Sequence, residues 1–317
     1  MPEISAAAVK ALRDQTGLPM MDCKRALQEA GGDAQAAVEW LRKAGKKTME
    51  KRAERETAFG RIAISADAGA GVGAMIELRC ESAPVAGNEE FVGLANDLAR
   101  QLAVGPGAAS PEELLAQPSP SKPGRTLKQQ FDDLTNRIRE VFRLQRIVRI
   151  DAPCAGYVHH NGATGVIVQI EGGNPEVAKD VCMQIVSMRP TVIHREELDP
   201  ALIEKERAIL TEAVQSEAAA MQQEAASLRS GDHPLCADTS PDAPSPAAVA
   251  ANLERKAENL MKNKDKVAEG RLREFCFAKH CLMEQPFVKE SKQTVAKVVQ
   301  AAKMKIVRFV HWEVGKE

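Results

Sequence analysis

Residues 9–27 read VKALRDQTGLPMMDCKRAL, a pattern that predicts two short helices joined by a turn. Val9 and Leu12 recur three residues apart and give the first helix one apolar face. Gly17 supplies the left-handed residue that ends this helix. Pro19 suits the first turn of the second helix, because the N–H that proline lacks would have no intrahelical acceptor there. The segment therefore predicts a helical start to the chain.

A third helix follows directly. The glycine pair 31–32 ends the second helix, and Asp33 is a good N-cap for the next one. This third helix is expected to stop near Gly45. Its inner face carries Ala37, Val38 and Leu41. Three short helices within residues 1–45 predict a small compact module.

Composition fits an intracellular protein of two or three domains. The chain has 317 residues, of which 44% are hydrophobic and only 3% aromatic. A net charge of −1 gives no overall attraction to nucleic acid or to an anionic membrane. Seven cysteines without a C-x-x-C pair favour a reducing compartment. The sequence contains no long apolar run and does not begin like a signal peptide, so we expect a cytoplasmic protein without a membrane partner.

Residues 42–56 carry many charges of both signs. We interpret them as a solvated helical linker, because no aromatic side chain is interleaved for base stacking and three glutamates offset the cations. A basic face directed to RNA or the ribosome is the alternative. The basic residues are Arg42, Lys43, Lys46, Lys47, Lys51, Arg52 and Arg55.

After this linker the pattern changes to strands. Residues 60–65 and 74–80 alternate apolar with polar or small side chains, and a glycine-rich turn at 67–73 joins them into a β-hairpin. The glycine spacing in that turn does not match a nucleotide-binding loop, and a strand follows it instead of a helix. An amphipathic helix comes next, with an apolar face made of Phe91, Leu94, Ala95, Leu98, Ala99 and Leu102. Residues 106–123 are proline-rich and are expected to begin as a loop.

The same order then repeats. A strand at 156–160, a glycine turn and a strand at 166–170 precede a helix at 177–186, and residues 307–314 alternate like a further strand of this second sheet. We predict an α+β multidomain protein. Its parts are the helical module with its linker (1–55), a first subdomain (56–151) and a related second subdomain (152–317), each with a small antiparallel sheet backed by helices.

The second subdomain is interrupted by two heptad-patterned helices. Their apolar residues are Ile203, Leu210, Val214, Met221, Ala225 and Leu228 in the first, and Leu253, Leu260 and Val267 at strict sevens in the second. Four prolines between them exclude a helix at 230–246. The pattern predicts a projecting antiparallel coiled-coil hairpin over about 200–275 with a mobile tip at 230–246.

Several motifs resemble the bacterial elongation factor Ts family, the guanine-nucleotide exchange factors of elongation factor Tu. They are the first helical module, Tyr157-x-His159 with its glycine turn and Gly165-Val166, KVAEGRL at 266–272, QPFV at 285–288 and WEVG at 312–315. The resemblance covers nearly the whole chain. It implies a UBA-like amino-terminal domain and a protein that binds the GTPase elongation factor Tu, opens its nucleotide site and performs no chemistry of its own. No cofactor and no direct nucleotide binding are expected.

The resemblance also implies which residues contact the GTPase. Two adjacent methionines cannot both face the inside of one helix, so at least one of the pair at 20–21 is expected at the interface. For His159, a plain exposed strand histidine is the alternative. The implied contact residues are Arg13, Met20, Met21, Lys24, Ser82, Ala83, Pro84, Val85, Asn88 and His159.

One departure from the family falls within this set. Residues 80–88 read CESAPVAGN, where the family commonly has Cys-x-Thr-Asp-Phe-Val-Ala-x-Asn. The aspartate and phenylalanine, which in the family reach the GTPase near its magnesium site, are Ala83 and Pro84 here. Pro84 cannot supply a flat aromatic ring, and it is expected to restrict Ala83 to extended conformations.

The sequence supports an enzymatic or metal-binding function less well than an exchange-factor function. Cys276, His280 and Cys281 lack the four convergent ligands of structural zinc, so we interpret the cysteines as core residues. His159 and His160 are expected on opposite faces of a strand, where they could not share a metal. Neither metal nor catalytic residues are therefore predicted. Three functions stay open: an exchange factor, a binder or scaffold of elongation factor Tu that has lost exchange, and a ribosome- or RNA-associated helical protein.

Overall fold

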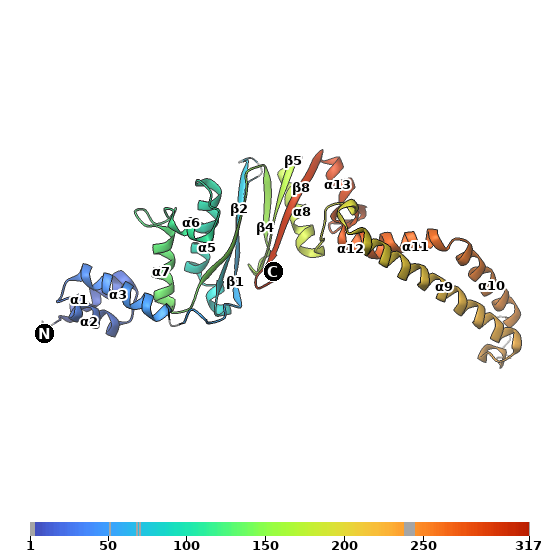
Figure 1. The fold of residues 1–317 in the computed structure, drawn as a ribbon, viewed down its shortest axis with the longest axis horizontal. Coiled ribbons are helices and arrows are strands. Elements are labelled where there is room, and N and C mark those ends of the chain that lie inside the picture. The colour runs from blue at the N-terminus through green and yellow to red at the C-terminus, as the bar shows by residue number, and fades with distance from the viewer. Residues whose placement is uncertain (1–3, 51, 68, 70, 238–244, 317) are drawn as a thin grey trace. The chain divides into compact units, whose positions relative to one another are not determined.

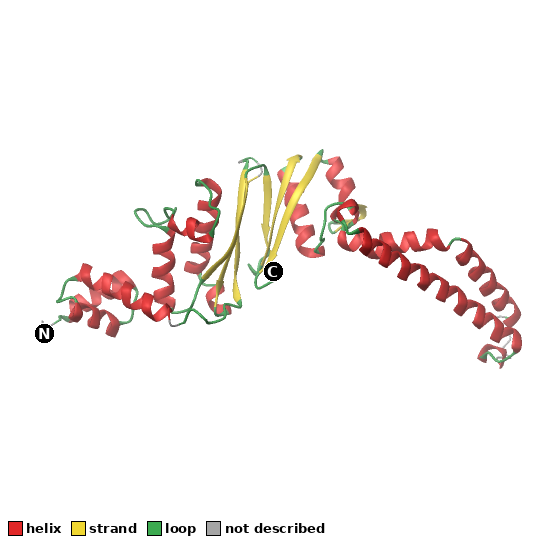
Figure 2. Cartoon of the chain, in the orientation of Figure 1, coloured by secondary structure: helices red, strands yellow, loops and turns green. Residues whose placement is uncertain are grey.

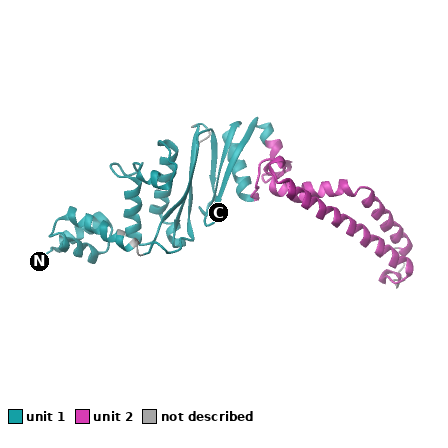
Figure 3. Ribbon diagram, viewed as in Figure 1, with its two compact units in different colours: residues 1–187, 299–317 teal, residues 188–298 magenta. Residues whose placement is uncertain are grey.

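The computed structural model describes residues 4–50, 52–67, 69, 71–237 and 245–316. Two compact units divide the chain, one made of residues 1–187 and 299–317 and the other of residues 188–298 (Figure 3). Helices and small antiparallel sheets make up both the predicted and the observed architecture, so the α+β class is confirmed (Figure 2). Among the described residues, no helix combines the length and the apolar character needed to cross a bilayer.

The amino-terminal module consists of α1 (Ala6–Thr16), α2 (Met20–Glu29) and α3 (Ala34–Glu50). Ser5 caps α1 by accepting the N–H of Ala8 at 3.2 Å, and Gly17 ends the helix with a φ of 69°. The three helices enclose a small aliphatic core. Its buried residues are Val9, Leu12, Cys23, Ala26, Leu27, Ala37 and Leu41.

The prediction that α3 stops near Gly45 is wrong, because the helix continues to Glu50. Gly45 serves close packing instead of termination. A Cβ at this position would lie 2.2 Å from Oδ1 of Asn136, so a larger residue would require that side chain to move. A single glycine inside a helix costs only about 1 kcal/mol relative to alanine, so the helix can continue through this position.

The first sheet has the strand order β1 (Phe59–Asp67), β2 (Val72–Cys80) and β3 (Arg143–Ile150), all antiparallel. The β1–β2 hairpin confirms the sequence prediction. Strand β3 was not predicted. Helices α4 (Ala83–Ala86), α5 (Glu89–Val104), α6 (Pro111–Ala116) and α7 (Leu127–Ile138) lie between β2 and β3 in the chain.

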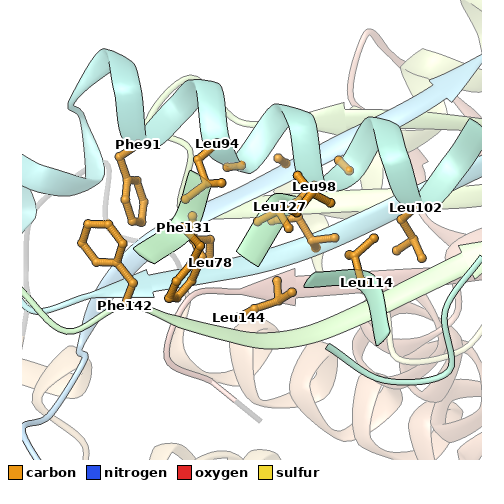
Figure 4. Packing of buried hydrophobic residues seen from close by; sticks show 14 of the residues in the cluster. Leu78, Phe91, Leu94, Leu98, Leu102, Leu114, Leu127, Phe131, Phe142 and Leu144 are labelled. Atoms are coloured by element: carbon orange, nitrogen blue, oxygen red, sulfur yellow. The ribbon is translucent and has the colours of Figure 1, made fainter. Parts of the chain in front are cut away.

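Helices α5, α6 and α7 cover one face of this sheet and form the largest core. Figure 4 shows the side chains of Phe91, Leu94, Leu98 and Leu102 in a row along α5, directed toward the sheet. Phe142 packs edge-on against Phe91, with ring centroids 5.0 Å apart. Helix α7, which lies just beyond the proline-rich segment, adds Leu127, Phe131 and Leu134 to the same core.

The second sheet has the order β4 (Cys154–Val158), β5 (Thr164–Gly172) and β8 (Met304–Glu313), again antiparallel. The predicted hairpin and closing strand are confirmed. Helix α8 (Pro175–Met188) follows β5 and buries Ala178, Val181, Cys182 and Ile185. Helix α13 (Val295–Ala301) leads into β8. The predicted subdomain boundaries remain a prediction.

The two sheets lie face to face (Figure 1). Their close approach depends on glycines, since a Cβ at Gly156 would lie 2.5 Å from Cγ2 of Ile64, and one at Gly165 2.5 Å from Cγ2 of Ile62. The N–H of Ile62 also donates to the carbonyl of Gly162 at 2.8 Å, which joins β1 to the β4–β5 turn. The shared core contains Ile62, Met75, Ile150, Cys154 and Ile167.

The unit of residues 188–298 is built on a long helix, α9 (Pro200–Ser230), which packs antiparallel against α10 (Pro246–Lys262) and α11 (Lys264–Leu272). A π-helical turn (Arg273–Phe277) and α12 (Ala278–His280) follow, and β6 (Pro286–Phe287) pairs with β7 (Glu290–Thr294). The described residues of this unit also form 3₁₀ turns at Arg195–Glu197, Pro234–Ala237 and Leu282–Glu284. The ion pair Arg229–Glu254, at 2.7 Å, joins the two arms of the hairpin.

The antiparallel hairpin is present, and its first arm buries Val214, Ala225 and Leu228 as predicted, but the second arm packs differently from the prediction. The second arm breaks at Asn263, and the buried residues of its α10 part are Ala250 and Ala257, whereas Leu253 and Leu260 are only half-buried. Alanine at these positions lets the two helices approach more closely than leucine would. The predicted mobile tip at 230–246 includes residues 238–244, which lie outside the described residues. Within the described part of that tip, Leu235 and Cys236 pack against the core of the hairpin.

Candidate functional site

The segment Ser82–Asn88 connects the end of β2 to α5. Ala83 and Pro84 are exposed, and Val85 turns inward and packs against the core of the first sheet. The Oδ1 atom of Asn88 accepts the N–H groups of Glu90 and Phe91 at 2.9 and 3.3 Å and so caps α5. Of the five contact residues expected in this segment, Ala83, Pro84 and Asn88 are exposed, and Asn88 is also engaged in the cap of α5, whereas Ser82 and Val85 are half-buried.

The expectation that Ala83 is extended is wrong. Ser82 is the extended residue, with φ −131° and ψ 151°, and Ala83 is the first residue of α4. The N–H of Ala86 donates to the carbonyl of Ser82 at 3.3 Å and closes one helical turn. Pro84 is tolerated there because the missing N–H belongs to a first turn, where no intrahelical acceptor is available.

Two carboxylates join this segment to residues 140–141, which precede β3. Glu140 accepts the hydroxyl of Ser82 at 2.6 Å and its backbone N–H at 3.1 Å. Glu81 accepts the N–H of Val141 at 2.8 Å and pairs with Arg55 at 3.0 Å. Although burial acts to raise the pKa of Glu81, the Val141 N–H and the Arg55 charge outweigh it and lower that pKa. Glu81, which directly precedes the segment, and Glu140, in the loop before β3, therefore hold it by hydrogen bonds from their carboxylates.

The thiol of Cys80, which ends β2, donates to the carbonyl of Ser82 at 3.3 Å. Burial, together with the negative charge of Glu140, raises the pKa of Cys80 to about 12. The thiol is therefore protonated at neutral pH and acts here as a packing residue and hydrogen-bond donor, not as a nucleophile.

The methionine pair lies at the start of α2. Met20 is 49% exposed and Met21 is 72% exposed, so neither belongs to the core of the module. Arg13, at the end of α1, and Lys24, on α2, are exposed as well. Exposed methionines offer an adaptable apolar surface, and their contact with a partner stays a prediction.

His159 lies just beyond β4 instead of within it, and the prediction of opposite faces for His159 and His160 is wrong. Their ring centroids are 4.2 Å apart, because both residues belong to the tight β4–β5 turn. The N–H of His159 donates to the carbonyl of Thr164 at 2.9 Å, and its carbonyl accepts the N–H of Gly162 at 2.8 Å. Its half-buried ring also packs edge-on against Tyr157.

The His159 turn and the Ser82–Asn88 segment lie at the same end of the stacked sheets. The start of β1 connects them, because Ile62 bonds to Gly162 in the turn while Phe59 pairs directly with Cys80 at the end of β2. The fold thus gathers residues that are far apart in the sequence. The methionine pair is carried separately, on the amino-terminal module.

Phe59 is a further candidate, which the sequence pattern did not predict. It is 45% exposed and pairs with Cys80, so its side chain lies on the face of the sheet that carries α4 and α5. An available signal was its position, since an aromatic residue directly before the first predicted strand is unusual in a chain with 3% aromatics.

The basic linker is not simply solvated, because its arginines bond to the first subdomain. Arg42 pairs with Asp133 at 3.3 Å, Arg52 donates to the carbonyl of Arg139 at 2.6 Å, and Arg55 pairs with Glu81. These guanidinium groups dock the linker onto its own chain. The arrangement favours a linker packed on its own chain over a basic face for RNA.

Cys276 and Cys281 are buried together with Leu272 and Phe277, which confirms their interpretation as core residues. Burial raises the pKa of Cys281 to about 11. In the part of the chain that the structure describes, no three His, Cys, Asp or Glu side chains converge as a metal site would require.

Comparison with known proteins gives a consistent result. Residues 84–316 match the family model described as Elongation factor TS. The chain is 31% identical over 315 residues to elongation factor Ts of Thioalkalivibrio sulfidiphilus, covering 98% of this chain and 92% of that protein. It is 34% identical to elongation factor Ts of Thermobifida fusca, covering 99% of both chains, and 34% identical to that of Aquifex aeolicus, covering 98% of both.

Proposed function

The chain belongs to the elongation factor Ts family, and from that membership we propose that it binds elongation factor Tu and promotes the release of GDP by stabilising the nucleotide-free GTPase. The observation that carries the proposal is the similarity itself, because it extends over nearly the whole length of both chains. The protein acts by binding and supplies no covalent chemistry.

The energetics define what such a factor must do. A nucleotide held at nanomolar affinity is released only against ~12 kcal/mol. A protein can offset this cost only by binding the empty GTPase more tightly than the loaded one, and the coupling is reciprocal. Tight binding of the factor therefore weakens nucleotide binding, and incoming nucleotide displaces the factor.

The exposed groups described above are suited to such a surface. On the amino-terminal module, Met20 and Met21 offer adaptable apolar contact, and Arg13 and Lys24 offer exposed positive charge. At the end of the stacked sheets, Ala83 and Pro84 on α4 form a second contact, with His159 in the neighbouring turn. Half-buried Ser82 and Val85 support this second contact from the inside, and exposed Asn88 caps α5 beside it.

Calorimetry with elongation factor Tu in its empty and GDP-loaded forms tests the proposal. We expect a tight complex without nucleotide that dissociates when excess GDP or GTP is added. Stopped-flow release of a fluorescent GDP should accelerate with the concentration of the factor. Equal affinity for the two forms would rule out exchange.

A binder that has lost exchange is the second candidate, and the small side chains at Ala83 and Pro84 favour it. These exposed residues offer no ring to insert beside a nucleotide site. Under this alternative the factor binds elongation factor Tu but leaves the rate of GDP release unchanged. The double variant Ala83→Asp, Pro84→Phe would then gain exchange activity, whereas under the first proposal the unmodified chain is already active on its own partner.

A further inference from the structure

Residues 81–82 and residues 140–141 hold each other by a reciprocal set of hydrogen bonds. The carboxylate of Glu81 accepts the backbone N–H of Val141 at 2.8 Å. In return, the carboxylate of Glu140 accepts the backbone N–H and the hydroxyl of Ser82, at 3.1 and 2.6 Å. Each pair thus uses one side chain to fix the backbone of the other.

Glu140 takes the place of an ordinary helix cap. A serine at the N-cap usually accepts an N–H from the first helical turn. Ser82 makes no such bond to α4, and its hydroxyl donates to Glu140 instead. A charged acceptor with two bonds fixes the extended backbone of Ser82 more firmly than a neutral cap would. The orientation of Ala83 and Pro84 therefore depends on a residue in a different loop.

The same loop also contacts the amino-terminal module. Arg139, which ends α7 in the left-handed region with φ 65°, forms an ion pair with Asp22 of α2. Its carbonyl accepts the guanidinium of Arg52 in the linker at 2.6 Å. Asp22 directly follows the exposed methionine pair. Residues 139–141, the connector, thus touch α2, the linker and the α4 turn.

We propose that Glu140 is a positioning residue for nucleotide exchange and that the connector fixes the α4 turn and the methionine surface before the partner arrives. The inference rests on the proposed function. Groups that are ordered in advance do not lose conformational freedom on binding, so more of the contact energy remains to stabilise the empty GTPase. Neither Glu140 nor Arg139 needs to touch the partner for this effect.

The test uses the full chain with elongation factor Tu carrying a fluorescent GDP. Glu140→Ala removes both acceptors from Ser82. We expect the maximal rate of GDP release to fall about tenfold, as for the loss of hydrogen bonds to a charged group. Glu140→Gln is the conservative variant, since its amide can still accept the N–H and donate to the hydroxyl, and it should recover most of the rate. Glu171→Ala, at an exposed ion pair with Lys305, is the matched control.

Amide hydrogen exchange gives a readout that does not depend on activity. The N–H groups of Ala86 and Asn88, which donate to Ser82 and Val85, should exchange about tenfold faster in Glu140→Ala, while the amides of β2 stay protected. Ser82→Ala keeps the backbone bond to Glu140 and should show a smaller effect of the same kind. It also serves as the second variant if Glu140→Ala does not fold.

The outcomes separate the two proposals. If the unmodified chain fails to accelerate GDP release, the proposed function is wrong, whatever the amides show. If it accelerates release, and Glu140→Ala does so equally well although its α4 amides exchange faster, the positioning role is wrong. Unchanged exchange at Ala86 and Asn88 would also overturn it, because the turn would then be held by other contacts.

Discussion

Arg146 and Glu77 form an ion pair at 2.5 Å in which the carboxylate is completely buried. Arg79 holds the other oxygen of Glu77 at 2.6 Å, and the N–H of Gly315 reaches it at 3.1 Å. The guanidinium of Arg146 lies 4.6 Å from the centre of the Trp312 ring. One carboxylate in the first sheet therefore secures the residues that follow β8.

Replacing Glu77 should destabilise the protein strongly. Glu77→Gln leaves two partly buried guanidinium groups without a counter-charge, and we expect a loss of about 3 kcal/mol in the free energy of unfolding, measured with urea. Glu171→Gln is the control, because its partner Lys305 is 69% exposed and the pair should contribute less than about 1 kcal/mol. Equal stabilities for the two variants would contradict this account of the buried pair.

Truncating the methionine pair should weaken binding without unfolding the module. Because Met20 and Met21 are both largely exposed, the double variant Met20→Ala, Met21→Ala removes little buried surface. We expect its affinity for empty elongation factor Tu, measured by calorimetry, to fall by about 1–3 kcal/mol. Met261→Ala, at a methionine 39% exposed on α10, is the matched control. Normal binding by the double variant would show that the pair lies outside the interface.

Phe59 should contribute an aromatic contact next to α4. For Phe59→Ala we expect the rate of GDP release to fall about tenfold, because burial of an aromatic ring against a partner is worth about 1.5–3 kcal/mol. Thermal stability should change little, since the ring is already half exposed in the free protein. Val104→Ala, which truncates an apolar residue 70% exposed at the end of α5, controls for general surface effects. A normal rate in Phe59→Ala would exclude this end of β1 from the interface.

Alkaline pH should destabilise the unit that contains the two sheets. Burial raises the pKa of Cys80, with help from the Glu140 charge, and that of Cys182, each to about 12. The unfolded chain loses these thiol protons above about pH 9, whereas the folded chain keeps them until about pH 12. The contribution of the buried, protonated thiols to the free energy of unfolding is therefore complete below pH 9. It is lost as the pH rises from about 9 to about 12.

Urea unfolding at pH 8, 9 and 10 measures the effect. Above about pH 9, each thiol should lower the free energy of unfolding by about 1.4 kcal/mol per pH unit. Cys80→Ala should remove the contribution of one thiol. An unchanged slope in that variant would assign the alkaline loss to other groups.

The sequence predicted most of the fold because the hydrophobic periods of the main elements are regular. It missed β3 for a physical reason. A register shift between Glu77 and Leu78 means that Leu144 pairs with Leu78 while Arg146 pairs with Glu77. The bulge breaks the two-residue alternation by which a strand is recognised. Helix α7 was missed beside the proline-rich segment, although Thr126 and Gln129 form a capping box at its start.

The candidate site could be predicted only in part. Exposure of the methionine pair follows from local helix geometry, since adjacent residues cannot share one inner face. The bond between Ser82 and Glu140 could not be foreseen, because it joins residues 58 positions apart on two loops whose separation depends on the packing of α5 and α7. Phe59 was overlooked for a related reason, since its exposure depends on where β1 begins.

The pairing of β5 with β8 has a consequence for synthesis of the chain on the ribosome. Residues 188–298 all lie between these two strands, so β8 emerges long after β4 and β5. The first sheet needs only residues up to Ile150 and is free to assemble on the emerging chain, as domains commonly do during translation. The second sheet cannot be completed before β8 is made, and the edge of β5 that pairs with β8 stays uncovered until then. Slow translation within residues 188–298 would prolong the time for which this nascent chain is open to aggregation.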